Sequence, residues 1–364
     1  MELYDRVMRF IGDAGTDDFE SLALAIFAHQ FETIGDYRRV CERRGATPRT
    51  IDDWRRIPPV PTLAFKRADL CAGPPERVFL TTGTTQGRET RGRHSMPCLA
   101  LYEAAAVAGM KQFLFPEIER MRLFTLVPAA GERPESSLAQ MVDWALRDFG
   151  TPDCARFAGA GDFDFVGLRA GLRASEADGE PICLLTTTAA LMHFLDDCNR
   201  RGESFRLTHG SRLMDTGGTK GTPRPLSRNG LLRAIWETLA IPGYFIVNEY
   251  GMTEMSSQFY DNVIRERHAG RFGRRHKAGP HWVRTRVLDP ATLEDAGDRG
   301  SGVLCHTDLA NAGSALVVLT EDVGGIVGDG FEIRGRIAGA EARGCSLALA
   351  DFAPVDGQPK AAGH

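Results

Sequence analysis

Apolar residues recur at steps of mostly three and four between Asp17 and Arg44, which is the spacing of one face of a helix. They are Leu22, Leu24, Ile26, Phe27, Phe31, Ile34 and Tyr37. Gly45 is expected to end this amphipathic helix, because glycine readily adopts the backbone conformation found at helix C-termini. The proline-rich segment 57–61 then excludes a continuing helix, and 78–80 is predicted as a short strand.

Short apolar runs typical of strands alternate with helical runs through the middle of the chain. The predicted strands are 123–127, 182–186, 213–216 and 245–248, and the predicted helices are 137–149, 189–199 and 231–239. This alternation predicts an α/β protein with mostly parallel sheets flanked by helices.

From Trp282 onward the pattern changes to strand-like stretches separated by turn residues. These stretches are 282–288, 302–306, 315–319 and 331–334. We therefore expect one large domain, 1–352, with a β-rich subdomain at about 281–340. Residues 353–364 hold two prolines, two glycines and few apolar side chains, so they are predicted to be a flexible tail.

Composition and net charge exclude some classes of protein and of binding partner. The 364 residues are 43% hydrophobic and carry a net charge of −4, which is typical of a soluble globular protein. A slightly negative net charge does not attract nucleic acid electrostatically, so we expect the binding partner to be a small molecule. With no signal-peptide pattern and no apolar run of about 18 residues, we expect a cytoplasmic protein without a membrane span. The eight cysteines lack zinc spacing and are expected to be reduced.

A glycine- and hydroxyl-rich segment directly follows the predicted strand 78–80. It reads Thr81-Thr82-Gly83-Thr84-Thr85-Gln86-Gly87 and is followed by Arg88, Arg91 and Arg93. Such a loop can wrap phosphate oxygens with backbone N–H groups and hydroxyls. It is not a Walker A loop, because Arg88-Glu89 stands where that motif has Lys-Ser/Thr. On its own it is equally consistent with a polar turn.

Two further motifs carry candidate nucleotide chemistry. In the segment 248–254, Tyr250 offers a ring for stacking on a base and Glu254 a carboxylate for Mg²⁺. In the segment 320–336, the Asp322 carboxylate and the Arg336 guanidinium could bracket ribose hydroxyls and a phosphate. Each alone is compatible with an ordinary loop or a surface ion pair.

Together the three motifs resemble the core motifs of the adenylate-forming superfamily of acyl-CoA ligases, luciferases and adenylation domains. Within it, the chain is most similar to the LuxE-type acyl-protein synthetases. These are the fatty-acid-activating subunits of bacterial luminescence fatty-acid reductase complexes, and they also occur in non-luminous bacteria. The resemblance is carried by Phe65-Lys66, 134–138, 216–221, the stretch from Tyr250 to Asp261, and 343–347. It covers most of the chain, to about Asp351.

The resemblance implies an adenylate-forming large domain that binds ATP and Mg²⁺ and converts a carboxylic acid, expected to be a fatty acid, to acyl-AMP. The ATP-binding residues it implies are Thr81, Thr82, Gly83, Thr84, Thr85, Gly87, Gly217, Gly218, Tyr250, Gly251, Asp322 and Arg336. Glu254 is expected to hold Mg²⁺, and Lys220 and Thr253 are expected to act in catalysis. Three positions depart from the superfamily pattern: Gln86, Glu321 and Asp215.

The end of the chain distinguishes members of the superfamily. Acyl-CoA ligases continue into a small mobile domain with a catalytic lysine, whereas only 28 residues follow Arg336, so we expect that domain to be absent. In the resembling family the acyl group passes to a cysteine near the C-terminus, and Cys345 matches that position. Its segment is expected to be flexible, and Arg343 would favour the thiolate. A buried structural cysteine is the alternative.

Two other functions stay open. The acyl group could pass to coenzyme A, a carrier-protein pantetheine or an amine, instead of passing through Cys345 to an acyl-CoA-reductase-like protein partner. Alternatively, the chain could be a non-catalytic subunit that binds such a reductase. Acid-dependent pyrophosphate release separates the last possibility from the first two.

Overall fold

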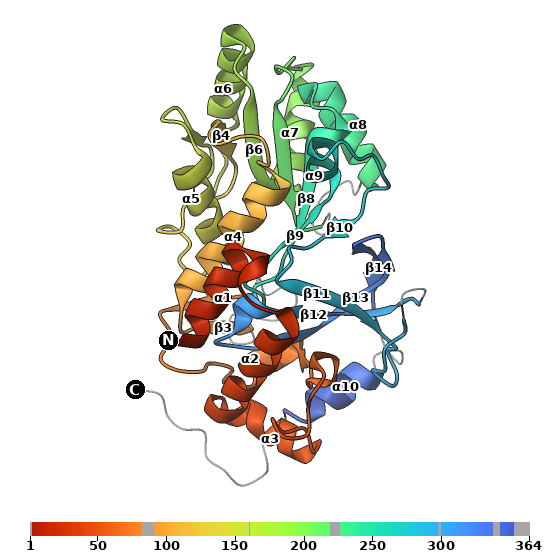
Figure 1. Ribbon diagram of the computed structural model, residues 1–364. Coiled ribbons are helices and arrows are strands. Elements are labelled where there is room, and N and C mark those ends of the chain that lie inside the picture. Colours follow the sequence, from red (N-terminus) through yellow and green to blue (C-terminus); the bar gives the residue numbers. More distant parts are fainter. Residues whose placement is uncertain are drawn as a thin grey trace. The chain divides into compact units, whose positions relative to one another are not determined.

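The computed structural model describes residues 2–81, 91–159, 161–218, 226–297, 300–337 and 343–352. The chain divides into two compact units (Figure 1). Unit 1 comprises Met1–Leu99, Trp282–Val327 and Phe331–His364, and unit 2 comprises Ala100–His281 and Gly328–Gly330. The predicted tail, 353–364, lies outside the described residues.

Unit 2 is built on a sheet with the strand order β10-β9-β8-β7-β6-β4-β5. The strands are β4 (Arg122–Thr125), β5 (Ala155–Arg156), β6 (Ile182–Thr187), β7 (Arg212–Thr216), β8 (Ile246–Tyr250), β9 (Phe259–Asp261) and β10 (Lys277–Ala278). The five strands from β4 to β8 run parallel, whereas β9 and β10 join antiparallel. Residues 182–186 of β6 are all buried, which explains a continuous apolar run instead of an alternating one. The predicted α/β fold with a mostly parallel sheet is confirmed.

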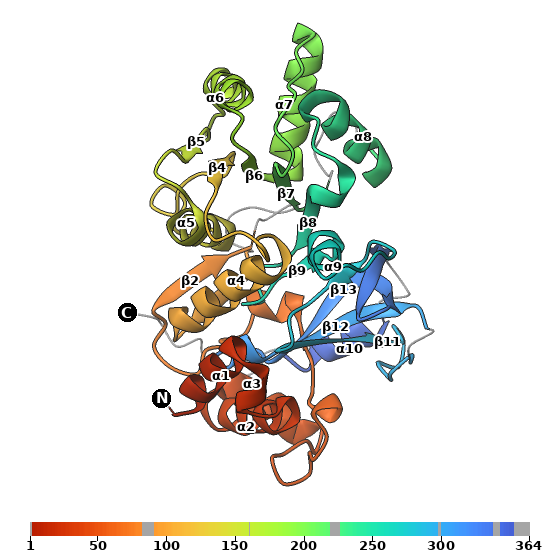
Figure 2. The ribbon, with the colours of Figure 1, turned by 45° about the horizontal axis from the view of Figure 1, so that its top comes forward.

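Helices precede, connect and follow the parallel strands of unit 2. They are α4 (Leu99–Phe113), α5 (Ser137–Phe149), α6 (Phe165–Asp178), α7 (Thr188–Arg201), α8 (Arg228–Leu239) and α9 (Val263–His268), and those that connect the parallel strands are α5 to α8. In Figures 1 and 2, α5 and α6 lie on the β4 side of the sheet and α8 lies on the β8 side. Four of these helices begin where a polar side chain accepts a hydrogen bond from the first turn, which fixes their start. The capping side chains are Ser136, Asp164, Thr187 and Ser227.

Unit 1 contains the strands predicted after Trp282. They are β11 (Val283–Leu288), β12 (Gly302–Asp308), β13 (Val317–Val327) and β14 (Gly330–Arg336), in that order in the sheet. β11, β12 and β13 pair antiparallel, and β1 (Val60–Pro61) adds to β13 in parallel. A separate antiparallel pair joins β2 (Arg77–Leu80) to β3 (Arg93–Met96).

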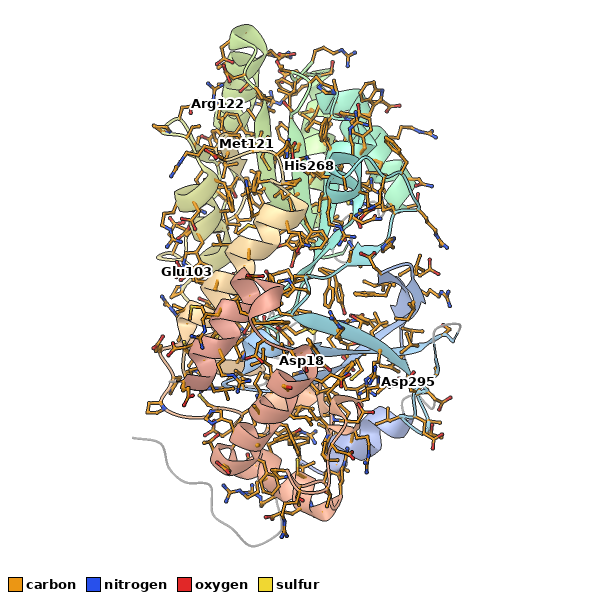
Figure 3. All side chains as sticks on the ribbon, in the orientation of Figure 1. Asp18, Glu103, Met121, Arg122, His268 and Asp295 are labelled. Atoms are coloured by element: carbon orange, nitrogen blue, oxygen red, sulfur yellow. The ribbon has the colours of Figure 1, made fainter. Side chains whose placement is uncertain are left out.

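The helical part of unit 1 differs from the prediction in one respect. The predicted helix 17–44 is two helices, α2 (Phe19–Thr33) and α3 (Gly35–Arg43), which follow α1 (Glu2–Gly12). Ile34 separates them in an extended conformation (φ −101°, ψ 97°), with a side chain that is 1% exposed. Burial of Ile34 thus stabilises a break that the periodicity alone does not show. Asp18, labelled in Figure 3, caps α2 by accepting a 2.9 Å hydrogen bond from the Ser21 amide.

The segment that carries Cys345 is a helix, α10 (Arg343–Ala350), and not the flexible segment that we predicted. The Gly344 amide donates to the Pro290 carbonyl (2.9 Å), and Arg44 Nε donates to Asp351 Oδ2 (2.8 Å). Ala348 and Phe352 are buried, so α10 is fixed to unit 1 at several points. The alanine- and leucine-rich sequence after Cys345 favours helix, which explains the difference.

Within the described ranges, no helix combines the length and apolar character that a bilayer crossing requires.

Candidate active site

The predicted site residues of unit 2 that the structure describes lie at the carboxyl ends of two neighbouring parallel strands, β7 and β8. Register pairs join Thr187 of β6 to Thr216 of β7, and Thr216 to Glu249 of β8. Gly217 and Gly218 follow β7 directly, and Gly251 follows β8. Loops at the carboxyl ends of parallel strands are where α/β proteins bind ligands. The fold thus brings the segments 216–218 and 249–254 to one edge of the sheet.

Asp215 holds this edge together. Its side chain is fully buried and accepts from the Thr188 hydroxyl (2.8 Å), the Asn248 side-chain amide (3.0 Å) and Arg228 Nη1 (2.8 Å). Thr188 also donates toward the Gly217 carbonyl (2.9 Å). One carboxylate therefore links α7, β7, β8 and α8, which fixes the backbone from which Gly217 and Gly218 emerge.

A second buried carboxylate, Asp261, gathers cationic side chains behind β8. It accepts from Lys277 Nζ (2.9 Å), Arg275 Nη1 (2.6 Å) and Arg228 Nη2 (3.3 Å), and from the Asn248 amide (3.0 Å). Burial by itself would raise the pKa of Asp261, but the charges of Lys277, Arg275 and Arg228 outweigh it and hold that pKa well below its usual range. Asp261 is therefore ionised at neutral pH.

Lys277 is buried in β10 and completes this cluster. Its ammonium donates to the Asn248 carbonyl (2.6 Å), Asn248 Oδ1 (2.7 Å) and Asp261, so each of its three donors has an acceptor. Burial lowers the pKa of Lys277, and the Asp261 charge opposes that shift. We call Asp215, Arg228, Asn248, Asp261, Arg275 and Lys277 the strand-end network.

Glu249 lies at the same edge with a different electrostatic environment. Its side chain is 4% exposed and is hydrogen-bonded to the Thr216 hydroxyl. Burial raises the pKa of Glu249 to about 7, against the opposing effects of the Thr216 hydrogen bond and the Lys277 charge. This carboxyl group can therefore exchange a proton near neutral pH, a property found most often at functional sites.

The loop after β8 begins at Tyr250, whose ring lies near that of Phe259, with centroids 6.1 Å apart. A Cβ atom at position 251 would come too close to the end of the Glu249 side chain, so a larger residue there would displace that carboxylate. Thr253 and Glu254 follow in the turn, and Glu254 is 9% exposed. One carboxylate together with phosphate oxygens is a usual Mg²⁺ environment, so Glu254 fits the predicted role.

Unit 1 contains the other predicted residues. The Thr81 hydroxyl accepts from the Gly92 amide (2.8 Å), and Arg91 Nε donates to the Thr81 carbonyl (2.5 Å), which closes the base of the predicted phosphate loop. Asp322 and Arg336 form an ion pair of 2.9 Å, with side chains 13% and 58% exposed. The exposed guanidinium is thus held in place by Asp322 with most of its surface open to solvent.

Several predicted residues cannot be placed. Thr82, Gly83, Thr84, Thr85, Gly87 and Lys220 lie outside the described residues. Cys345 lies in α10, with no side-chain placement described.

Sequence reasoning missed Lys277, Arg228 and Glu249 as residues of this site. Lys277 stands 16 residues beyond Asp261 and joins it only through the pairing of β10 with β9. A signal was available for Asp261, which ends the stretch that carries the most specific part of the resemblance. For Lys277 the available signal was the scarcity of lysine, since the chain has just five.

The fold and the strand-end edge define the class of protein: an α/β protein with a candidate ligand site at the carboxyl ends of parallel strands. The family model described as "Acyl-protein synthetase, LuxE" matches residues 8–353. The chain therefore belongs to the LuxE acyl-protein synthetase family, which confirms the resemblance and the prediction of a ligase family.

Three solved structures illustrate what the chain is similar to. ATP-bound MatB from Rhodopseudomonas palustris is 16% identical, with 72% of this chain and 49% of that chain covered and a TM-score of 0.48. A long-chain-fatty-acid-CoA ligase (FadD1) from Archaeoglobus fulgidus is 14% identical, with 71% and 50% covered and a TM-score of 0.47. The luciferase-like enzyme of the nonluminescent Zophobas morio mealworm is 15% identical, with 71% and 57% covered and a TM-score of 0.45.

The chain thus spans about half the length of these structures. Among curated proteins, none matches the chain.

Proposed function

We propose that this protein activates a carboxylic acid, in the first instance a fatty acid, with ATP and then carries the acyl group as a thioester on Cys345. In the first step a carboxylate oxygen attacks the α-phosphorus of ATP, the α–β phosphoanhydride bond breaks, and acyl-AMP and pyrophosphate form. In the second step the Cys345 thiolate attacks the acyl carbon, AMP leaves, and the thiol proton passes to solvent.

The observation that carries the proposal is the strand-end edge of unit 2 in a chain of the acyl-protein synthetase family. There the segments 216–218 and 249–254 emerge from neighbouring strands and are fixed by Asp215 and the buried cations. A rigid, pre-oriented backbone suits a reaction whose catalysis depends mainly on positioning and on electrostatic stabilisation of phosphate charge.

The roles of single residues follow the family resemblance. The resemblance implies that Gly217, Gly218, Tyr250 and Gly251 contact ATP. It implies the same for Thr81, Asp322 and Arg336. Arg336 is suited to a phosphate or ribose contact because its guanidinium is exposed yet held by Asp322. Mg²⁺, when bound at Glu254, neutralises phosphate charge. Thr253 donates a hydroxyl to the reacting groups.

The raised pKa of Glu249 predicts how binding of the acid substrate depends on pH. Because its pKa is raised to about 7, it is largely protonated in mildly acidic solution and carries less negative charge beside an incoming carboxylate. Acid binding is therefore expected to weaken as the pH rises through 7, as Glu249 ionises and repels the substrate.

The test of the first step is acid-dependent exchange of pyrophosphate into ATP, with Mg²⁺ and without coenzyme A, over a panel of fatty and aromatic acids. We expect exchange with one chain-length class. If the folded protein catalyses no exchange with any acid of the panel, the proposal is contradicted and a non-catalytic subunit is favoured.

The acceptor is tested separately. If acyl-CoA forms with coenzyme A as the only acceptor, and forms equally well in Cys345→Ser, the acyl group passes directly to coenzyme A and not through Cys345. A reductase-like protein partner is expected to discharge the acyl group from the wild type only.

A further inference from the structure

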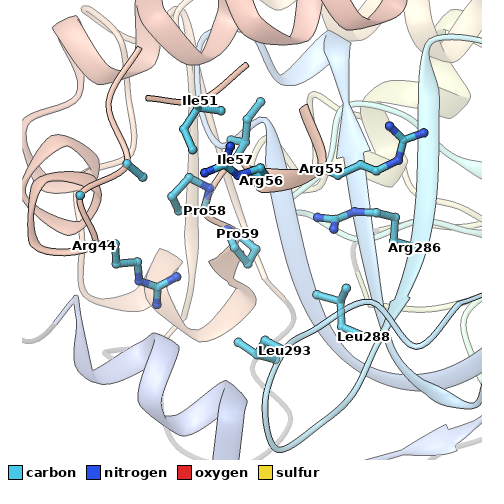
Figure 4. Close-up of a pocket in the computed structure, with 12 residues that line it drawn as sticks. Arg44, Ile51, Arg55, Arg56, Ile57, Pro58, Pro59, Arg286, Leu288 and Leu293 are labelled. Carbon is cyan, nitrogen blue, oxygen red and sulfur yellow. The ribbon is translucent and has the colours of Figure 1, made fainter. Parts of the chain in front are cut away.

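A pocket of about 380 Å³ lies entirely within unit 1 and includes none of the predicted site residues (Figure 4). Its polar lining is arginine: Arg44, Arg55, Arg56 and Arg286. Its apolar lining includes Ile57 and Leu288, which are both buried in the core. The volume falls in the range of small-molecule sites, and the lining combines apolar side chains with four cationic groups. We call it the arginine pocket.

Arg286 differs from the other three arginines of the pocket. Its side chain is 12% exposed, its guanidinium lies over the Trp54 ring at 5.7 Å, and its buried Nε has no hydrogen-bond partner. Its nearest carboxylate, Asp295 (labelled in Figure 3), stands 4.0 Å away and is 46% exposed. The described residues therefore offer this buried cation no hydrogen-bond acceptor.

The three other arginines are matched to carboxylates. Arg44 is paired with Asp351, Arg55 with Asp53, and Arg56 with Asp52. An oxyanion entering the pocket would therefore gain most from Arg286, because a buried guanidinium without acceptors is unfavourable until an anion satisfies it. An apolar stem on that anion would use the remaining wall.

The pocket also adjoins the helix that carries Cys345. Leu293 lines the pocket, and a Cβ atom at Gly344 would lie 3.0 Å from Leu293 Cγ. At the other end of α10, Asp351 is held by Arg44, which lines the pocket too. Both ends of α10 are thus in contact with pocket residues.

We propose that the arginine pocket binds a small oxyanion on an apolar stem, an alkyl phosphate or an alkyl carboxylate, held by Arg286, and that its occupancy changes the reactivity of Cys345 through α10. The binding site stands independently of the reaction, whereas the significance of Cys345 rests on the proposed function.

Calorimetric titration of the full chain with octyl phosphate, octanoate and inorganic phosphate tests the site. We expect Arg286→Gln to bind the favoured probe at least about tenfold more weakly than the wild type, the loss expected for a charge-assisted pair. Arg286→Lys should retain part of the affinity. Arg284→Gln is the matched control, since Arg284 is on the same strand and lies over Phe19 at 4.7 Å outside the pocket lining.

The three probes separate the sources of the anion. Tighter binding of octyl phosphate than of inorganic phosphate supports the apolar stem, and preference between octyl phosphate and octanoate assigns the headgroup. Octanoate binding that does not respond to Arg286→Gln or Arg286→Lys, with no octyl phosphate binding, would overturn the proposal, because the acid would then occupy another site.

The second readout is the alkylation rate of the Cys345 peptide, followed by mass spectrometry. We expect the favoured probe to change that rate in the wild type and in Arg284→Gln but not in Arg286→Gln. An unchanged rate in the saturated wild type would overturn the coupling to α10. Pyrophosphate exchange is measured in parallel. No exchange, with probe binding intact, would refute only the proposed function. Exchange without probe binding would refute only the arginine pocket as a binding site.

Discussion

The buried cations of the two units differ in whether hydrogen-bond acceptors lie within reach. In unit 2, Lys277 and Arg275 each donate to Asp261 and to backbone carbonyls, so the strand-end network satisfies them internally. In unit 1, Arg286 is nearly as buried but has only a distant, half-exposed carboxylate at 4.0 Å. A satisfied network positions the backbone around it, whereas an unsatisfied cation retains its capacity to bind an anion. The difference separates a group that builds a site from a group that binds a ligand.

Lys277→Met is expected to have the largest effect on stability. It removes a cation from beside buried Asp261 and leaves the Asn248 oxygens without their donor, so we expect a loss of about 3–5 kcal/mol in the free energy of unfolding. Urea denaturation measures it. Lys111→Met, at an exposed lysine that donates to the Ile118 carbonyl (2.9 Å), is the control and should cost less than about 1 kcal/mol. Equal losses would show that the network is not exceptional.

Glu249→Gln tests the raised pKa at the strand-end edge. The folded protein holds this proton more tightly than the unfolded chain, with a pKa of about 7 against 4.5. The stability it contributes is complete below pH 4.5 and is lost as pH rises from 4.5 to 7. At 1.36 kcal/mol per pKa unit, the variant should gain about 3 kcal/mol relative to the wild type between these limits. Parallel stability curves from pH 4.5 to 8 would contradict this.

Thr188→Val probes a neutral member of the same edge. The hydroxyl donates to Asp215 and toward two backbone carbonyls, so its loss should cost about 1–2 kcal/mol, because Asp215 keeps Arg228 and Asn248. Thermal unfolding at pH 7 is sufficient to detect it. Thr47→Val, at a partly exposed threonine, is the control. A Thr188 effect as small as that of the control would show that this hydroxyl does not stabilise the strand-end network.

Arg286→Met is expected to have the smallest effect on stability, within about 1 kcal/mol of the wild type in either direction. Its guanidinium gives up no hydrogen bond to the described residues, and methionine can cover the same apolar wall. The same denaturation series as for Lys277→Met checks it. A loss of 3 kcal/mol or more would show that Arg286 is structurally satisfied, and the contrast with unit 2 would fail.

Local patterns predicted the regular elements of the fold and much less of its electrostatics. The spacing of apolar residues predicted β7 and α5, because each buries one continuous run or stripe. It did not predict the break at Ile34, which depends on burial against other elements. Nor did it predict helix α10, because an apolar run of four residues, 347–350, is too short to show a helical period.

The strand-end network could not be predicted, since its members come from β7, α8, β8, β9, β10 and the segment before β10, and they meet only after strand pairing. The roles of Tyr250, Gly251 and Glu254 were proposed from the resemblance to a family, and they stay predictions. Lys277 and Arg286 belong to no motif. What distinguishes them is whether an acceptor lies within reach, and that depends on the three-dimensional arrangement alone.

The measurement that tests the central claim most directly is transfer of a radiolabelled fatty acid to the protein with ATP and Mg²⁺, followed by hydroxylamine treatment. Wild type and the control Cys98→Ser should carry label that hydroxylamine releases, whereas Cys345→Ser should carry none and still catalyse pyrophosphate exchange. Label retained on Cys345→Ser, or exchange lost together with the label, would contradict the account.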